Sequence, residues 1–243
     1  MDLPALTARY RADGVVTLPA LLAPAEVAEV RREYGRYARE IAPTLGPADV
    51  TFEADNRTVR NLWRLEQHDA WFAAFAQQPR LLELAAALAN GRPLLVAVET
   101  FNKPARVGSA VPPHQDNAYF CQTPPDMFTL WIALDPATAE NGPVTYVRGS
   151  HHDGVRPHRP SGVRGNSFGL AEPPTPAPGD LHVGLLAAGD ALAHHCQTIH
   201  YSAPNRSAHP RLGLLLVYRG THTQTDPAMK RAYDEARRLA GMA

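Results

Sequence analysis

The sequence has few cysteines, no net charge and no long apolar run. Only two of its 243 residues are cysteine, Cys121 and Cys196, so neither a disulfide framework nor a Cys-x-x-Cys zinc pattern is possible. Lysine and arginine number 24, as do aspartate and glutamate. This balance argues against binding to nucleic acid or to a membrane surface, because both need a cationic excess. No apolar stretch approaches the roughly 20 residues of a membrane span.

The first residues also lack the features of a signal peptide. The segment MDLPALTARYRADG contains the acidic Asp2 and has no apolar centre, which favours a cytoplasmic protein. Barrels and sandwiches of about 200–250 residues commonly form one domain. We therefore expect a single enzyme-sized domain over residues 1–243.

Proline and histidine are the residue types in excess. The 23 prolines are roughly twice the usual share, and they separate short apolar runs as in a strand-rich fold. Ten of the 11 histidines lie between His114 and His222, and only His68 lies outside this range. This concentration suggests a metal site without indicating which residues form it.

Apolar periodicity predicts helices at both ends and strands in the middle. Helical spacing begins at Pro24, a second helix covers 79–90, and Asp226 is placed to cap a third. Strands are expected at 94–101, 110–119, 127–134, 143–147, 181–186, 190–195, 198–202 and 211–218. The pattern predicts a mainly β fold, either a sandwich or a double-stranded barrel, with helices flanking it. The helical layer is expected mainly in 1–92 and 226–241, the β core in 94–219, and a lid loop in 151–179.

Two residues in the predicted strand VPPHQDNAYF can supply metal ligands. His114 and Asp116 are two apart, so both would project from the same face of a strand. They match two ligands of the two-histidine, one-carboxylate facial triad. A pair of this kind also occurs by chance on a protein surface, so the assignment needs a third ligand from a later strand.

The segment GDALAHHCQTIHYSAPNRSAHPR offers that third ligand. His200 has the most favourable context, because the turn-forming residues 204–207 and the apolar run RLGLLLVY follow it as in a hairpin. If Ser202 pairs with Arg211, His200 pairs with Gly213, which would leave room for a metal. A buried Arg211 would require an anionic partner such as a dicarboxylate.

His194 and His195 are adjacent, so they face opposite ways on a strand. One is expected to point toward the site, either as a hydrogen-bonding neighbour of a metal ligand or as a structural histidine.

Four strings in this order resemble the phytanoyl-CoA dioxygenase family: PHQDNAYF, LWIALD, ENGPVTYVRGSH and HYSAPNRSAHPR. The run DGVVTLPALLAPAEVAEVRR is similar to the family's opening strand and helix, and the resemblance covers residues 8–220. Members are non-haem oxygenases, so the resemblance implies a double-stranded β-helix core of the jelly-roll, cupin-like type. It also implies Fe(II), 2-oxoglutarate and O2 as cofactor and cosubstrates.

The resemblance assigns roles to eight positions. It places iron on His114, Asp116 and His200. The positions implied to bind 2-oxoglutarate are Arg211, Ser202, Gln115, Trp131 and Lys103. Family halogenases have alanine in place of the carboxylate ligand, so Asp116 argues against halogenation. Glu99 lies where some relatives have an apolar residue, and the resemblance assigns it no role.

We therefore expect a dioxygenase that hydroxylates a small organic metabolite while 2-oxoglutarate and O2 become succinate and CO2. One alternative is desaturation or ring formation with the same oxidant in a biosynthetic pathway. Others are a non-catalytic metal- or ligand-binding barrel, which the presence of Arg211 and Ser202 disfavours, and a zinc site for hydrolysis. The expected partner is a small molecule, not nucleic acid or a membrane. The sequence does not indicate which molecule it is or the oligomeric state.

Overall fold

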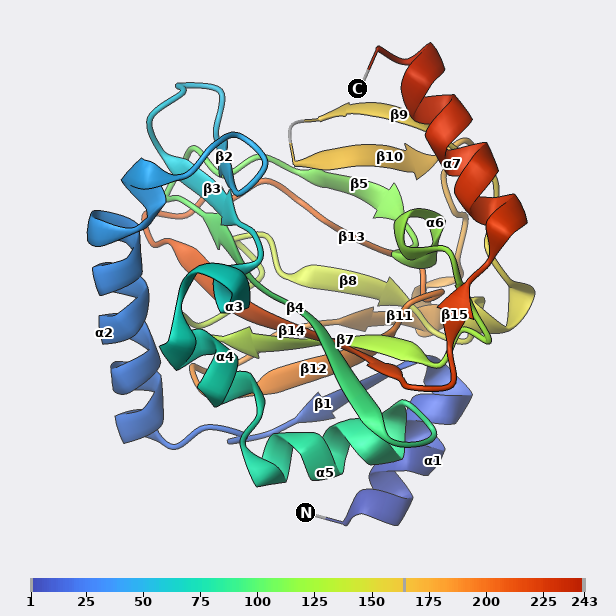
Figure 1. Ribbon diagram of the computed structural model, residues 1–243, viewed down its shortest axis with the longest axis horizontal. Coiled ribbons are helices and arrows are strands. Elements are labelled where there is room, and N and C mark those ends of the chain that lie inside the picture. Colours follow the sequence, from blue (N-terminus) through green and yellow to red (C-terminus); the bar gives the residue numbers. More distant parts are fainter. Residues whose placement is uncertain (1, 164, 242–243) are drawn as a thin grey trace.

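The computed structural model describes residues 2–163 and 165–241 (Figure 1). Its helices are α1 (Leu3–Asp13), α2 (Pro24–Glu40), α3 (Leu65–His68), α4 (Ala70–Ala76), α5 (Pro79–Leu88), α6 (Asn117–Phe120) and α7 (Pro227–Leu239). Short 3-10 turns cover Ala42–Thr44, Ser150–Asp153 and Pro178–Asp180. None of the helices in these ranges is both long and apolar enough to cross a membrane.

The strands form a large and a small antiparallel sheet. In spatial order, the large sheet contains β1 (Val15–Leu18), β12 (Ala191–His195), β7 (Met127–Ala133), β14 (Arg211–Gly220), β4 (Pro93–Lys103), β3 (Val59–Leu62) and β2 (Val50–Phe52). The small sheet contains β11 (Leu181–Val183), β8 (Val144–Val147), β13 (His200–Ser202) and β5 (Val111–His114). Two further ribbons pair β9 (His158–Val163) with β10 (Asn166–Leu170), and β6 (Gln122–Thr123) with β15 (Gln224–Thr225).

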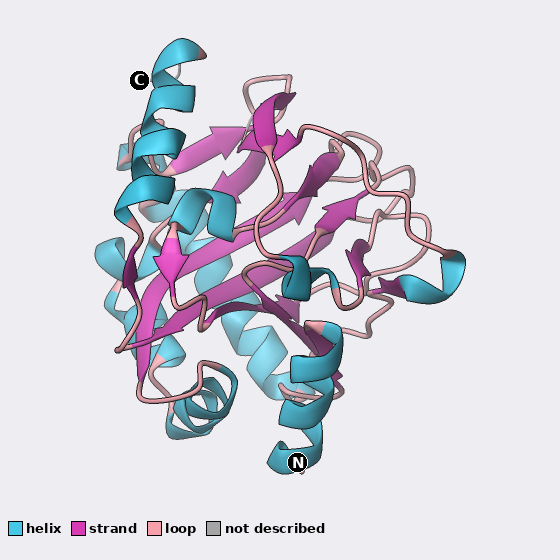
Figure 2. Cartoon of the chain, turned by 90° about the vertical axis from the view of Figure 1, so that its right-hand side faces the viewer, coloured by secondary structure: helices cyan, strands magenta, loops and turns pink. Residues whose placement is uncertain are grey.

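The two sheets face each other across a cavity, and helices cover the outer face of the large sheet (Figures 1 and 2). This arrangement confirms the predicted mainly β fold with flanking helices, and it is a double-stranded β-helix of the jelly-roll type. Proline at the start of α2, α5 and α7 agrees with the predicted helix starts. The Asp226 carboxylate caps α7 by accepting from the amides of Ala228 and Met229 at 2.8 and 3.0 Å.

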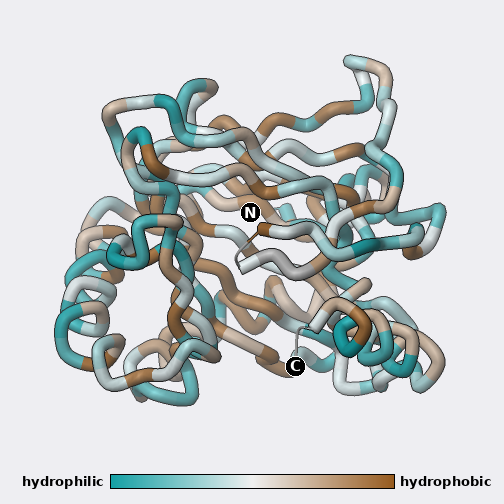
Figure 3. Tube along the Cα trace, turned by 90° about the horizontal axis from the view of Figure 1, so that it is seen from above, coloured by the Kyte–Doolittle hydropathy of each residue, from teal (hydrophilic) through white to brown (hydrophobic). Residues whose placement is uncertain are grey.

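Side-chain alternation along β7 separates the hydrophobic core from the cavity. Phe128, Leu130 and Ile132 join the core beneath the helices, whereas Thr129 and Trp131 line the cavity on the opposite face. The two faces are those predicted from the alternating sequence. Figure 3 shows the hydropathy along the chain, with hydrophobic residues more frequent toward the middle and hydrophilic residues more frequent on the surrounding loops.

The predicted strand over 110–119 is wrong in its second half. β5 ends at His114, and Asp116 has helical dihedral angles (φ −59°, ψ −35°) at the start of α6. The amide of Tyr119 donates to the Asp116 carbonyl at 2.9 Å, which closes the turn. His114 and Asp116 therefore converge because the chain turns after β5, and not because they alternate along one strand.

The predicted hairpin between His200 and Arg211 is also wrong. β13 pairs with β5 and β8, so that His200 lies opposite His114 and Tyr146. β14 belongs to the other sheet, where Arg211 pairs with Lys103. Residues 203–210 cross from one sheet to the other. The side-chain amide of Asn205 holds this crossing by donating to the carbonyls of Lys103 and His209 at 2.9 and 2.8 Å.

Two other segments contain strands that the sequence pattern did not predict. The expected loop 151–179 includes the β9–β10 ribbon, although Arg164 within it lies outside the described residues. The expected helical layer 1–92 includes β2 and β3, which extend the large sheet beyond β4. These strands are three to six residues long. Runs this short carry too little periodicity to be distinguished from loops.

Candidate metal centre and active-site cavity

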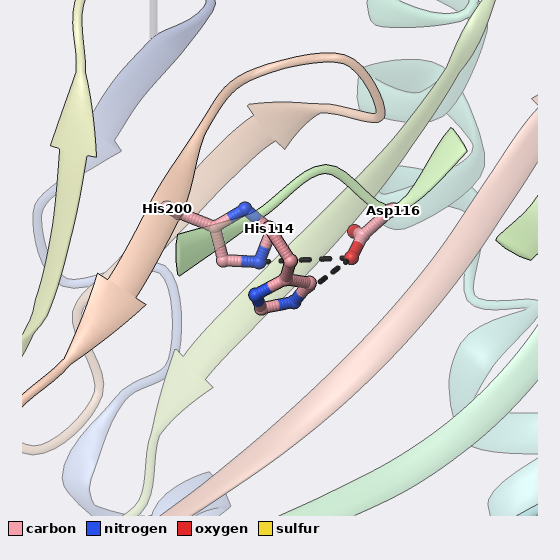
Figure 4. Close-up of side chains that lie close together, drawn as sticks. All are labelled: His114, Asp116 and His200. Carbon is pink, nitrogen blue, oxygen red and sulfur yellow. Dashed lines mark ion pairs between the residues drawn. The ribbon is translucent and has the colours of Figure 1, made fainter. Parts of the chain in front are cut away.

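Two histidines and one carboxylate meet between the sheets (Figure 4). His114 ends β5, His200 begins the neighbouring β13, and Asp116 follows β5 in the turn before α6. One potential ligand atom from each lies within 4.8 Å of the others. Both histidine Nε2 atoms are 3.6 Å from Asp116 Oδ1. The three residues predicted as metal ligands are thus brought together.

Backbone hydrogen bonds orient both imidazoles toward this point. His114 Nδ1 lies 2.9 Å from the Pro112 carbonyl, and His200 Nδ1 lies 2.9 Å from the Thr198 carbonyl. A carbonyl oxygen can only accept, so each Nδ1 carries the proton, and each Nε2 has a free lone pair that faces the point between the three ligand atoms. This is the arrangement in which metal-binding histidines are normally held.

The two oxygens of Asp116 have different partners. Oδ1 faces the two Nε2 atoms, whereas Oδ2 accepts from the Thr129 hydroxyl at 3.1 Å and lies 3.2 Å from His194 Nε2. An ionised carboxylate can only accept, so His194 donates. Oδ2 is thereby held by protein groups, and Oδ1 is left to bind a metal.

The local charges suit a divalent cation. Burial lowers the pKa of both His114 and His200, which keeps them in the neutral form that binds metals. Burial alone would raise the pKa of Asp116, but His200, His194 and His114 outweigh it and hold the pKa below its usual range. The donor set is thus two neutral imidazoles and one carboxylate, which fits Fe(II).

Of the adjacent histidines, His194 points into the cavity and His195 points away from it. The His195 ring packs 6.1 Å from that of Tyr10 and 5.1 Å from that of His151, between centroids. Burial lowers its pKa to about 3, so it is a neutral packing residue. The prediction that one of the pair reaches the site is confirmed.

Arg211 supplies a buried positive charge in the same cavity. Its side chain is 1% exposed, and its Nη1 donates to the Gly142 carbonyl at 2.5 Å. The guanidinium lies over the Trp131 ring, 5.0 Å from the centroid. Its Nε has no hydrogen-bond partner, and no carboxylate of the described residues forms an ion pair with it. An unpaired buried arginine is costly, so this position fits an anionic ligand.

Gly213 makes room for the Trp131 indole. A Cβ at this position would lie 2.3 Å from Trp131 Cζ2, far inside the contact distance. The predicted function of Gly213, to leave space opposite His200, is therefore wrong. It allows Trp131 to lie flat against the sheet, where the indole supports Arg211.

The structure separates the other three predicted cosubstrate residues. Ser202 is buried and lines the cavity with Arg211 and Trp131. Gln115 lies outside the lining, where its side chain donates to the carbonyls of Gly154 and Gln197 at 2.8 and 2.6 Å. Lys103 also lies outside it, and its Nζ donates to the carbonyls of Ser109 and Ala203 at 2.6 Å each. The resemblance implies that Gln115 and Lys103 bind 2-oxoglutarate, but backbone carbonyls hold the side-chain nitrogens of both residues outside the cavity lining.

The buried Lys103 lies on β4 directly opposite Arg211 of β14. Burial, together with the nearby charges of Arg211 and Arg60, lowers the pKa of Lys103 to about 6. A neutral amine has two N–H groups, which matches the two carbonyls that it contacts.

Several cavity residues were missed from the sequence. Thr129 orients Asp116, Gly142 orients Arg211, and Tyr146 stacks on His200 with 5.7 Å between ring centroids. Alternation from Trp131 could have indicated Thr129. Asn141 and Gly142 are residue types typical of a turn. The Asn141 side chain closes this turn by accepting from the Thr138 amide and donating to the Pro136 carbonyl. The Gly142 carbonyl that contacts Arg211 could not be predicted, because every residue has a backbone carbonyl.

The cavity between the sheets has a volume of about 580 Å³. Aromatic and charged residues also line the cavity, among them Trp63, Arg64, Glu99, Tyr119 and Tyr233. The Tyr119 hydroxyl donates to the Phe168 carbonyl at 2.5 Å, which ties the turn after Asp116 to the β9–β10 ribbon. The ring of Tyr233 on α7 packs against both of these residues.

A jelly roll that gathers two histidines and a carboxylate beside a buried arginine defines a class of protein, the non-haem iron oxygenases that use 2-oxoglutarate. The sequence profile of the phytanoyl-CoA dioxygenase (PhyH) family matches residues 10–213. The chain belongs to this family, and it is an Fe(II)- and 2-oxoglutarate-dependent dioxygenase.

Individual relatives agree with this assignment. The chain is 31% identical over 240 residues to L-proline trans-4-hydroxylase of Streptomyces griseoviridis. This alignment covers 90% of this chain and 87% of that protein. It is 29% identical to phytanoyl-CoA dioxygenase of Arabidopsis thaliana, but the match spans only 60% of this chain and 52% of that one.

A solved structure also has the same fold. The epimerase SnoN, in complex with Fe3+, alpha ketoglutarate and nogalamycin RO, superposes with a TM-score of 0.73 and 26% identity. The superposition covers 96% of this chain and 89% of SnoN.

Proposed function

We propose that His114, Asp116 and His200 hold Fe(II), and that Arg211 and Ser202 bind the distal carboxylate of 2-oxoglutarate. The observation that carries this assignment is the joint position of the triad and an unpaired buried arginine on facing walls of one cavity. Arginine matches a carboxylate in both charge and geometry, because its N–H groups donate in parallel. Trp131 supports the guanidinium from one side.

We propose hydroxylation of a small organic metabolite as the reaction. Fe(II) held by His114, Asp116 and His200 would supply the activation of O2 in a reaction that converts 2-oxoglutarate, O2 and a substrate C–H group to succinate, CO2 and a C–OH group. The protein contributes position and charge. Thr129 and His194 hold Asp116, backbone carbonyls orient the two histidines, and the surrounding aromatic residues exclude water.

The substrate is expected to be about the size of an amino acid. One relative, of which this chain covers 87%, is named L-proline trans-4-hydroxylase. In addition, the cavity of about 580 Å³ must hold 2-oxoglutarate as well as the substrate. We therefore propose free amino and imino acids, with L-proline among them, as the first compounds to test. Another oxidative outcome on the same cofactor is the second candidate, since the similar SnoN is named an epimerase.

We also propose that residues 1–243 form one domain that works in the cytoplasm. Cys121 and Cys196 are buried free thiols, and a reducing compartment keeps both thiols and Fe(II) reduced.

The test is succinate formation by protein that is loaded with Fe(II) under anaerobic conditions and then exposed to O2. We expect succinate above the uncoupled background when a substrate is present, and none when Zn²⁺ replaces Fe(II). His200→Ala should abolish it, whereas His209→Ala, which removes an exposed histidine outside the cavity, should not. Failure of the Fe(II)-loaded protein to bind 2-oxoglutarate would refute the assignment.

A further inference from the structure

Glu99 is an acidic residue of the cavity that the proposed cofactor site does not use. It lies in β4 and pairs with Leu215 of β14, which in turn pairs with Trp131 of β7. The three side chains form one row across the sheet, on the face that lines the cavity. Adjacent strands are about 4.8 Å apart, so Glu99 lies about 10 Å along this row from Trp131. Its carboxylate is thus presented to the part of the cavity beside the cosubstrate residues.

The Glu99 carboxylate has no hydrogen bond or ion pair with any described residue, although its neighbours of the same type have partners. Glu66 accepts from the Val98 amide at 2.7 Å, and Glu53 accepts from the Ser109 hydroxyl at 2.6 Å. The hydrogen bonds of Glu66 and Glu53 within the protein explain why these two carboxylates are present. Glu99 has no such structural function, since its removal would leave no described donor unsatisfied.

The surroundings make an ionised Glu99 unfavourable in the absence of a ligand. Burial raises its pKa to about 8, and the negative charges of Asp116 and Glu66 add to this effect. The guanidinium of Arg64 lines the same cavity, but it donates to Asp49 at 2.7 Å and to the Ala48 carbonyl at 3.2 Å. Arg64 therefore forms its ion pair with Asp49, and it only partly offsets the rise in the pKa of Glu99.

A ligand that pairs with the Glu99 carboxylate would explain the presence of an acidic residue without a protein partner in this cavity. A positive charge within hydrogen-bond distance would favour the ionised carboxylate and replace the water lost on burial. We propose that Glu99 binds a positively charged nitrogen of the substrate, so that the enzyme oxidises a C–H group of an amino or imino compound. This inference rests on the proposed dioxygenase function, and it assigns the residue that recognises the substrate nitrogen.

The experiment compares matched compounds on the Fe(II)- and 2-oxoglutarate-loaded enzyme. Each free amino or imino acid is paired with the carboxylic acid of the same skeleton that lacks the nitrogen, for example L-proline with cyclopentanecarboxylic acid. Binding is measured by calorimetry without O2, and coupled succinate formation is measured with O2. We expect only the nitrogen-containing member of a pair to bind and to stimulate succinate formation.

Variants then assign that preference to Glu99. Glu99→Gln should weaken amine binding about 10- to 100-fold, because the amide keeps the shape but loses the charge. Glu99→Asp should retain part of the affinity. Glu83→Gln makes the same chemical change at an exposed residue of α5 and should leave amine affinity unchanged. The affinity of Glu99→Gln for 2-oxoglutarate is measured separately, as a check that the cosubstrate site is intact.

Two results would overturn the inference. One is equal binding of the nitrogen-free compound. The other is unchanged amine affinity in Glu99→Gln, which would show that a neutral hydrogen-bonding group is sufficient. In either case the wild-type enzyme would still bind 2-oxoglutarate and form succinate, so the proposed function would stand. Loss of 2-oxoglutarate binding in the wild type would instead refute the proposed function.

Discussion

The two oxygens of Asp116 have different functions, which explains how a carboxylate in a turn can be held in a fixed position as a metal ligand. Thr129 and His194 hold Oδ2 from the large sheet, although Asp116 itself follows a strand of the small sheet. The ligand is therefore fixed by residues from both sheets. Neighbours of this kind tune metal affinity without touching the metal.

His194→Ala should lower Fe(II) affinity about 10- to 100-fold, because it releases one of the two groups that hold Oδ2. Thr129→Val, which keeps the shape and removes the hydroxyl, should act in the same direction. Competition with a metal-binding dye measures the affinity. His195→Ala is the matched control on the opposite face of β12. An equal effect of His194→Ala and His195→Ala would indicate general destabilisation instead.

Arg211→Ala should weaken 2-oxoglutarate binding about 100-fold, since it removes a buried charge that pairs with the distal carboxylate. Arg211→Lys should recover only part of the affinity, because lysine cannot donate in parallel. Calorimetric titration of the Fe(II)-loaded protein without O2 gives both values. An unchanged affinity for 2-oxoglutarate in Arg211→Ala would show that the cosubstrate assignment is wrong.

Glu99→Gln should stabilise the metal-free, ligand-free protein at high pH. In the unfolded chain this carboxyl ionises near pH 4.5, but the folded protein holds the proton up to about pH 8. The folded state therefore binds more protons in this interval, and the free energy of unfolding falls as pH rises through it. Urea unfolding from pH 4.5 to 8 should show a growing advantage of the variant, up to about 4 kcal/mol at the upper end. A difference that does not change with pH would contradict this explanation.

At the scale of elements, β14 serves the core and the site at once. Leu212, Leu214 and Leu216 are buried beneath the helices, whereas Arg211 and Leu215 face the cavity. Gly213 lies between the latter two and leaves space for the Trp131 indole. One face of this strand therefore packs the core, and the other face lines the cavity.

Gly213→Ala should therefore displace Trp131 and weaken the support of Arg211. We expect a higher KM for 2-oxoglutarate and a loss of about 1–3 kcal/mol in the free energy of unfolding, which is typical of an overpacked site. Kinetics at varied 2-oxoglutarate and urea unfolding measure the two effects. Gly179→Ala is a suitable control, because a Cβ there would contact nothing.

At the scale of the whole molecule, the two faces of the large sheet have different functions: one packs against the helices and stabilises the fold, and the other lines the cavity. Leu214→Ala on the helix-covered face should cost about 2–5 kcal/mol in the free energy of unfolding, because it opens a cavity in the core. The molecules that remain folded should bind 2-oxoglutarate with normal affinity, since the cavity-lining face is unchanged. Urea unfolding and calorimetry on the same sample check both points. A parallel loss of 2-oxoglutarate affinity would show that the two faces are coupled.

Much of the fold and most of the site could be predicted from local pattern and motif. The helices at Pro24, Pro79 and Asp226 have strong starting signals, and β7 alternates clearly enough to assign both faces. Very short strands such as β2 and β3 could not be predicted, because they are held by pairing with each other and, through β3, with β4.

The sequence by itself determined the chemistry that is available: two histidines, one aspartate and one arginine at characteristic spacings, within a strand-rich chain. Only the tertiary structure decided how they meet. His200 and Arg211 lie on facing sheets, Asp116 reaches the histidines through a turn, and Glu99 comes to the same cavity from a distant strand. The physical reason is that periodicity reports which face of an element is buried, whereas the partner of that face depends on long-range pairing.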